Sequence, residues 1–120
     1  MTTEYGEGAV FEGMFFDING KPIELEEWGE LIKGTGGDEY EYKRIGLDQV
    51  GECRVSTVWL GINHRWTGDG RPLIFETMVF GGKMDGEQWR WETKEQAERE
   101  HKRIVCEVRE EEGNGQEGSD

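Results

Sequence analysis

Apolar residues occupy both odd and even positions in two stretches of the chain, Arg54–Gly61 and Pro72–Gly81. Both stretches are rich in β-branched and aromatic residues, which are typical of strands. Successive side chains of a strand point to opposite faces of a sheet, so a strand with one face in water should alternate apolar and polar residues. We therefore expect two central strands that need cover on both faces, from helices, a second layer or a second copy of the chain.

The same criteria predict three further strands. They cover Ala9–Asp17, about Glu39–Ile45 and Glu87–Glu92. In the last of them, Trp89 and Trp91 fall on one face because the side-chain period of a strand is two. The expected sheet is antiparallel and has about five strands.

Two helices are predicted, a short acidic one in the N-terminal third of the chain and a longer one near the C-terminus. Residues Leu25–Lys33 have apolar residues at helical spacing and glutamates at the N-terminal end, where negative charge is favourable. Thr93 and Gln96 form a capping box that begins the second helix, whose apolar stripe should lie on the sheet. Residues 113–120 have nothing apolar to bury, and we expect them to be disordered.

These elements predict an α+β fold, with the C-terminal helix packed on one face of the sheet and a short acidic N-terminal helix. The 120 residues fit a single domain over residues 1–112 and a short tail. No apolar run approaches the ~18–20 residues of a membrane span, and no signal-peptide pattern is present. Cys53 and Cys106 have no short spacing and fit a reducing compartment. We therefore expect a cytoplasmic protein that makes no contact with a membrane.

The net charge of −13 is concentrated at the two ends of the chain. Residues 1–42 carry a net charge of −9 and residues 107–120 a net charge of −5, whereas residues 43–106 are close to neutral. Such a protein repels phosphates, so direct nucleic-acid binding is disfavoured and a basic protein partner is favoured. Three glutamates of the first helix face away from its apolar stripe and are the candidate contact residues: Glu26, Glu27 and Glu30. The alternative is that the acidity only maintains solubility.

Glu76 lies inside an apolar strand, where an unpaired carboxylate is costly. It should either form an ion pair, with Arg54, Arg90 or His101 as candidate partners, or face a cavity as a ligand-binding or catalytic group.

His64 and His101 are the two histidines of the chain. His64 begins a polar loop, and His101 falls on the buried stripe of the second helix, where a histidine is more typical of the core than of a ligand. Zinc sites show short paired spacings that these histidines and the two cysteines lack, so no metal is expected. Nothing marks either cysteine as an activated nucleophile, and no cofactor is implied.

A second interpretation is a small-ligand module that binds a nucleotide. Arginine and tryptophan side chains on the last strand could stack a base, although simple alternation along the strand also explains their spacing. The pocket of this alternative would comprise Glu76, His64, Arg90, Trp89, Trp91 and His101. A third and weaker interpretation is a small enzyme that uses Glu76 with one of the histidines.

The strand sequences Val55–Gly61 and Pro72–Gly81, a nearby His64, and a helix with Ala97 and His101 resemble a family of small proteins. This family belongs to tailed phages and prophages, mainly of actinobacteria, and the resemblance covers about residues 40–106. It implies no activity, substrate or cofactor, but it implies a phage accessory protein that acts on a host component. We therefore expect binding to a host protein with a basic surface, and a homodimer that covers the second face of the strands.

Overall fold

An antiparallel sheet and a long C-terminal helix form the body of the molecule. A computed structural model describes residues 14–33, 43–64 and 71–119, except for the side chains of residues 114–119. The elements and their bounds, in chain order, are α2 (Leu25–Lys33), β1 (Arg44–Val50), β2 (Cys53–Trp59), β3 (Phe75–Phe80), β4 (Gln88–Trp91) and α4 (Lys94–Ser119).

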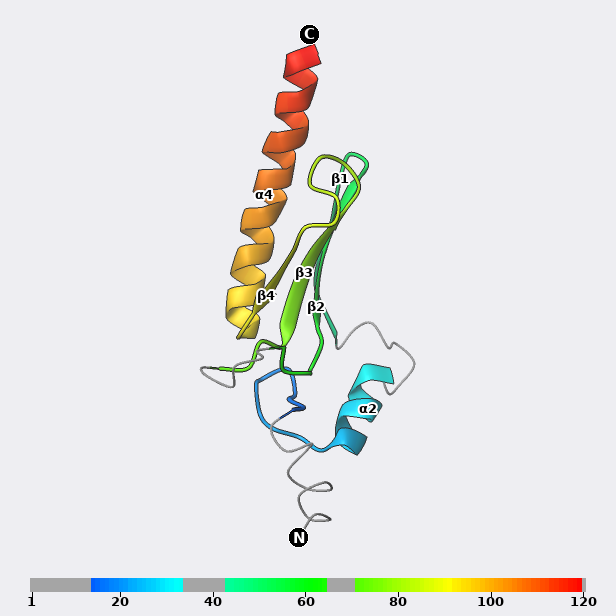
Figure 1. The fold of residues 1–120 in the computed structure, drawn as a ribbon, viewed down its shortest axis with the longest axis vertical. Helices are drawn as coiled ribbons and strands as arrows, with labels where there is room; N and C mark the ends of the chain where they lie inside the picture. Colours follow the sequence, from blue (N-terminus) through cyan, green and yellow to red (C-terminus); the bar gives the residue numbers. More distant parts are fainter. Residues whose placement is uncertain (1–13, 34–42, 65–70, 120) are drawn as a thin grey trace.

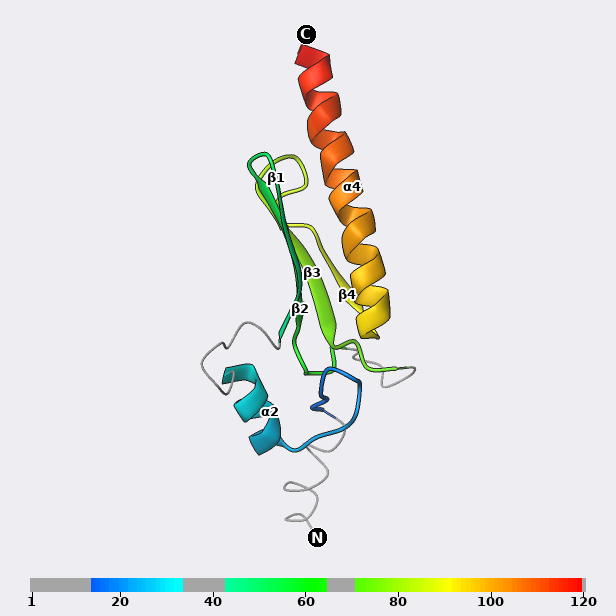
Figure 2. The ribbon, with the colours of Figure 1, turned by 180° about the vertical axis from the view of Figure 1, so that it is seen from behind.

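The strands pair in the order β1-β2-β3-β4, and every neighbouring pair is antiparallel. Helix α4 lies along one face of this sheet (Figure 1). Helix α2 lies beyond one end of the sheet, on the side away from α4, in the front view and in the view from behind (Figure 2). The α+β fold with an antiparallel sheet and a packed C-terminal helix is thus confirmed.

The sheet has four strands in the described part of the chain, where we expected about five. Residues 9–13 of the strand expected at Ala9–Asp17 lie outside the described residues. Phe15 and Phe16 make isolated bridges only. The Asp17 carboxylate accepts hydrogen bonds from the backbone amides two and four residues later, at 2.9 Å each. Such side-chain bonds to the backbone form turns, and here they end the extended stretch.

The strand expected at Glu39–Ile45 is displaced along the chain. Residues 39–42 lie outside the described residues, and β1 continues to Val50. Gly46 and the polar Asp48 occupy positions of β1 that face α4, which hid the strand from a search for apolar alternation. His101 of α4 explains both residues. Gly46 leaves room for its ring, and Asp48 forms a hydrogen bond with it.

The sheet has two unlike faces because side chains alternate along each strand. The α4 face includes the fully buried residues Val55, Trp59, Phe75 and Val79. The opposite face, here called the outer face, carries a mixture of polar, charged and apolar residues in register across the four strands. Its members are Arg44, Leu47, Gln49, Arg54, Ser56, Val58, Glu76, Met78, Phe80, Gln88 and Arg90.

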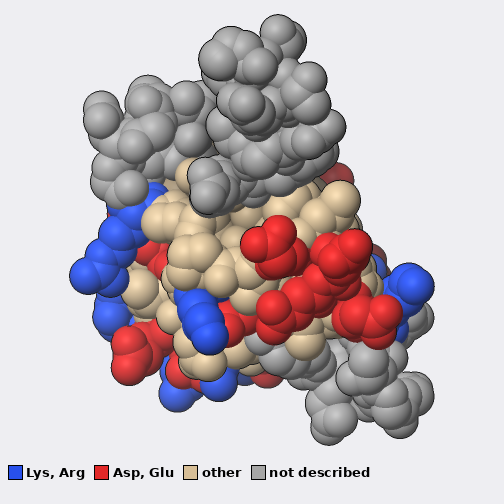
Figure 3. Space-filling view, turned by 90° about the horizontal axis from the view of Figure 1, so that it is seen from below, with Lys and Arg blue, Asp and Glu red and all other residues tan. Residues whose placement is uncertain are grey.

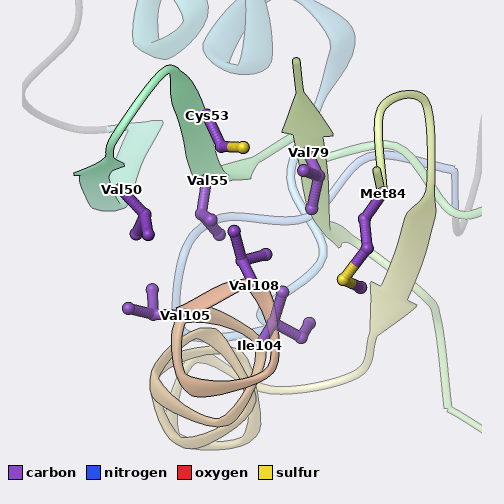
Figure 4. Close-up of a cluster of buried hydrophobic side chains, with 8 residues drawn as sticks. All are labelled: Val50, Cys53, Val55, Val79, Met84, Ile104, Val105 and Val108. Atoms are coloured by element: carbon purple, nitrogen blue, oxygen red, sulfur yellow. The ribbon is translucent and has the colours of Figure 1, made fainter. Parts of the chain in front are cut away.

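The core lies between the sheet and α4 in two clusters. One is shown in Figure 4, where valines of three strands meet three aliphatic residues of the helix. Its members are Val50, Cys53, Val55, Val79, Met84, Ile104, Val105 and Val108. The other gathers Phe16, Trp59, Ile74, Phe75 and Ala97, and the half-buried apolar residues of α2 pack against it. The second cluster therefore holds α2 to the end of the sheet.

Helix α4 begins as the capping box predicts. The Gln96 amide donates to the Thr93 hydroxyl at 3.0 Å, which is the predicted cap. The Gln96 side chain accepts at 2.8 Å from the amide of Glu92, one residue before the cap. At its other end the helix is described as far as Ser119, and the disorder expected for residues 113–120 stays a prediction. Each added helical residue makes its own backbone hydrogen bond, so a helix can extend beyond its last buried side chain.

We predict that the chain shortened to end at Glu112 keeps its stability. Glu112 itself is retained because its carboxylate accepts from the Lys83 amide at 2.9 Å. Calorimetry should show a melting temperature within about 2 °C of the full chain, a smaller change than 1 kcal/mol produces in a domain of this size. A loss of several degrees would show that residues 113–120 make stabilising contacts.

Candidate functional site

The acidic residues of α2 lie on the surface, at the end of the molecule. Glu26, Glu27 and Glu30 are all exposed, as the sequence predicted. Figure 3, a view from below, shows acidic side chains gathered on this end of the molecule. Among the residues that the structure describes, none forms an ion pair with these three glutamates. We call Glu26, Glu27 and Glu30 the α2 acidic surface.

A tryptophan fixes α2 in place behind this surface. The Trp28 indole donates to the Leu60 carbonyl at 2.9 Å, and its ring lies 5.2 Å from the Phe15 ring, centroid to centroid. Gly61 has a φ of +74°, and a Cβ at this position would lie 2.6 Å from the Trp28 ring nitrogen. Glycine is thus required there for the backbone conformation and for the close approach of the tryptophan.

Glu76 forms the ion pair that was one of its two expected roles. Its carboxylate lies 3.2 Å from the Arg90 guanidinium, directly across β3 and β4 on the outer face. The Glu76 side chain is 15% exposed and that of Arg90 34%. Arg90 Nε is buried without a hydrogen-bond partner among the described groups. The pair therefore explains how a carboxylate is tolerated in this strand.

His64 lies close enough to Glu76 and Arg90 for both charges to affect its pKa. Burial lowers the pKa of the His64 imidazole below its usual 6.5, the positive charge of Arg90 lowers it further, and Glu76 acts in the opposite sense. Three of the predicted site residues, His64, Glu76 and Arg90, are thus neighbours.

The other three predicted site residues lie on the opposite side of the sheet. Trp89 and Trp91 pack against the core clusters on the α4 face, and His101 is buried on α4. The structure therefore does not bring the six residues of the nucleotide interpretation into one pocket. The sheet separates the stacking rings from the charged groups.

His101 belongs to a relay of hydrogen bonds at the centre of the α4 face. Its Nε2 lies 2.8 Å from the Asp48 carboxylate, and its Nδ1 lies 2.7 Å from the Thr57 hydroxyl. The Thr57 hydroxyl lies 2.5 Å from that of Thr77, which accepts from the Trp91 indole at 2.9 Å. We call these five residues the relay.

One direction of donation satisfies every member of the relay. An indole N–H can only donate, and an ionised carboxylate can only accept. A run of donations from Trp91 toward Asp48 has Thr77 donate to Thr57 and Thr57 to His101 Nδ1. This arrangement places the proton of a neutral His101 on Nε2, from which it is donated to Asp48.

Asp48, His101 and Thr57 have the order of a carboxylate–imidazole–hydroxyl triad. Thr57 is 0% exposed, however, and its hydroxyl is engaged by both Thr77 and His101. A substrate therefore has no path to this oxygen in the described conformation. The relay serves packing, because it satisfies buried polar groups that would otherwise destabilise the core.

Sequence reasoning found His101 as a buried residue but missed its partners. Thr57 and Thr77 fitted the pattern of ordinary strand residues, and Asp48 lay beyond the strand that we predicted. Gly46 was the available signal, since a Cβ there would lie 2.8 Å from the His101 ring. A glycine in a strand often marks such a close approach.

The two cysteines are free thiols. Burial is the main cause that raises the pKa of the Cys53 thiol, and the neighbouring carboxylate of Glu112 raises it further. Cys106 is a free, exposed thiol on α4. In the described part of the chain, no three histidine, cysteine or acidic side chains are placed to hold a metal ion.

An open cleft of about 650 Å³ lies beside the start of α4. Its walls are mainly polar and carry both signs of charge, and none of the predicted site residues lines it. The lining residues are Ile18, Asn19, Gly20, Arg71, Phe75, Glu92, Thr93, Lys94, Glu95 and Glu98.

Comparison with protein-family models, with curated proteins and with solved structures found no match for this chain. The resemblance to the phage family therefore stays an expectation. Of the helices in the described segments, none has the length and apolar character to cross a membrane.

We predict that Thr57→Val destabilises the protein by about 1–3 kcal/mol, because the change keeps the side-chain shape but leaves buried groups of Thr77 and His101 without partners. Urea denaturation measures the change in unfolding free energy. Ser56→Ala, one residue away on the outer face, is the control and should change it by less than about 0.5 kcal/mol. Equal effects of the two substitutions would contradict the assigned role of the relay.

A second prediction concerns His64 and pH. Its lowered pKa means that the folded protein binds the proton less tightly than the unfolded chain, so protonation favours unfolding. The stability due to neutral His64 is therefore complete above its usual pKa of 6.5 and is lost as the pH falls below that value. Denaturation between about pH 8 and pH 5 should show a smaller acid loss for His64→Gln than for the natural protein. If the unfolding free energies of the two proteins fell equally between these pH values, His64 would not be the cause of the loss.

Proposed function

We propose that this protein acts by binding, and that the α2 acidic surface contacts a protein with a basic surface. In the phage setting that the resemblance implies, the partner is a host protein and the complex forms in the host cytoplasm. One observation carries the proposal: three glutamates stand exposed on a helix that is held to the body by Trp28.

The position of these charges suits recognition better than stability. Exposed charges contribute little to the free energy of folding. Glu26 and Glu27 lie in the first turn of α2, where they also favour the helix dipole, but Glu30 lies beyond that turn. Charges on an accessible end of a molecule steer an oppositely charged partner and raise its association rate.

Helix α2 presents the glutamates on a fixed support. Its half-buried residues pack on the second core cluster, and its indole hydrogen bond to Leu60 joins it to the chain just after β2. A surface that is already ordered loses less conformational entropy on binding than a flexible segment would.

We predict that replacing Glu26, Glu27 and Glu30 together with glutamine slows association with the host partner and leaves the melting temperature nearly unchanged. The partner is first identified by affinity capture from host lysate and then purified. Surface plasmon resonance at two salt concentrations measures the association rate, which salt should also lower for the natural protein.

The matched control replaces Glu95, Glu110 and Glu111 of α4 with glutamine, which removes the same charge from exposed positions elsewhere. Association at the natural rate in the α2 variant, or an equal loss in the α4 control, would rule out recognition by the α2 acidic surface. The acidity would then serve solubility alone.

A further inference from the structure

An open groove crosses the outer face of β1 and β2, next to α2. It has a volume of about 380 Å³, and Ile32 of α2 forms part of its wall. We call it the outer groove. Three cationic and three apolar side chains of its lining give the groove its chemistry: Lys43, Arg44, Arg54, Leu47, Val58 and Phe80.

The outer groove combines an apolar surface with positive charge. Leu47 is 45% exposed and Phe80 is 38% exposed, and no part of the described chain covers them. The Arg54 guanidinium lies 5.0 Å from the centre of the Phe80 ring. Lys43 and Arg44 add two more cationic side chains to the lining. An occupant should therefore be acidic and should offer an apolar side chain.

The α2 acidic surface has this chemistry. Next to its three glutamates, Leu25 is 45% exposed on the same helix. The outer face and α2 also border the same side of the molecule, away from α4 (Figures 1 and 2). One side of the protein thus has an acidic part with an exposed leucine and a cationic part with an apolar floor.

We propose that a second copy of the chain covers the outer groove, in a two-fold dimer in which each α2 acidic surface lies against the groove of the other copy. A two-fold axis brings the same patch of both copies together, so the patch must be complementary to itself. A patch with one acidic half and one cationic half meets this condition. Two molecules of net charge −13 otherwise repel each other, so attraction between copies needs such a cationic surface.

The dimer uses the same glutamates that the proposed function assigns to a basic partner. A basic host protein and the second copy would then compete for one surface, and partner binding would separate the dimer. The inference goes beyond the proposed function, and each can fail without the other. Arg54→Glu leaves α2 intact, so it should weaken the dimer while the host partner still binds.

Sedimentation velocity over a range of micromolar concentrations tests the dimer. The natural protein should sediment as a dimer, and Arg54→Glu should weaken self-association by at least about tenfold. Changing Glu26, Glu27 and Glu30 together to lysine reverses the charge of the α2 acidic surface and should weaken self-association as well. Arg109→Glu is the matched control, because it reverses an exposed arginine on α4. Circular dichroism verifies that each variant is folded.

Mixing the two reversed variants gives the sharpest result. At position 54, each variant alone sets like charges against each other, but in a mixed pair position 54 of both copies again faces side chains of opposite charge. The mixture should therefore form a dimer although neither component does. A natural protein that stays monomeric, a dimer insensitive to either reversal, or a mixture that fails to associate would each overturn the inference. A monomer whose groove binds a different acidic protein would overturn it as well.

Discussion

A single relay of hydrogen bonds joins the four strands to α4. Asp48 lies on β1, Thr57 on β2, Thr77 on β3, Trp91 on β4 and His101 on α4. Every buried member needs its partner, because an unsatisfied polar group in a core costs about 1–3 kcal/mol. A slip of one residue in any strand would turn its member to the other face and break the relay. Strand register and the rotation of the helix are therefore fixed together.

The relay also decides what is left for binding. By holding α4 on one face of the sheet, it directs Trp89 and Trp91 into the core and leaves Glu76 and Arg90 on the other face. The aromatic and charged groups cannot then form one pocket. The outer face and the end of the molecule that carries α2 stay available for binding. Both are charged, open surfaces and not enclosed pockets.

Local patterns predicted the elements whose apolar residues and caps are contiguous in the chain. Both central strands, the last strand, the capped start of α4 and its buried stripe could all be derived in this way. The pattern failed for β1, because the α4 face of that strand holds Gly46 and Asp48 in place of apolar residues. Their role depends on His101, about fifty residues away in the chain, which no local pattern contains. Arg90 could be named in advance as one of three candidate partners of Glu76, because both residues lay on predicted strands.

The distribution of charge along the chain has a spatial consequence that the sequence alone did not contain. Acidic residues dominate the N-terminal third, but in the fold the glutamates of α2 share one side of the molecule with Arg54 and the other cations of the outer groove. The nearly neutral middle of the sequence therefore contributes a cationic side chain, Arg54, to the outer face, where Glu76 is paired with Arg90. Asp48 lies on the α4 face, where it accepts a hydrogen bond from His101. The recognition properties of this protein thus follow from which face of the sheet each charged side chain occupies.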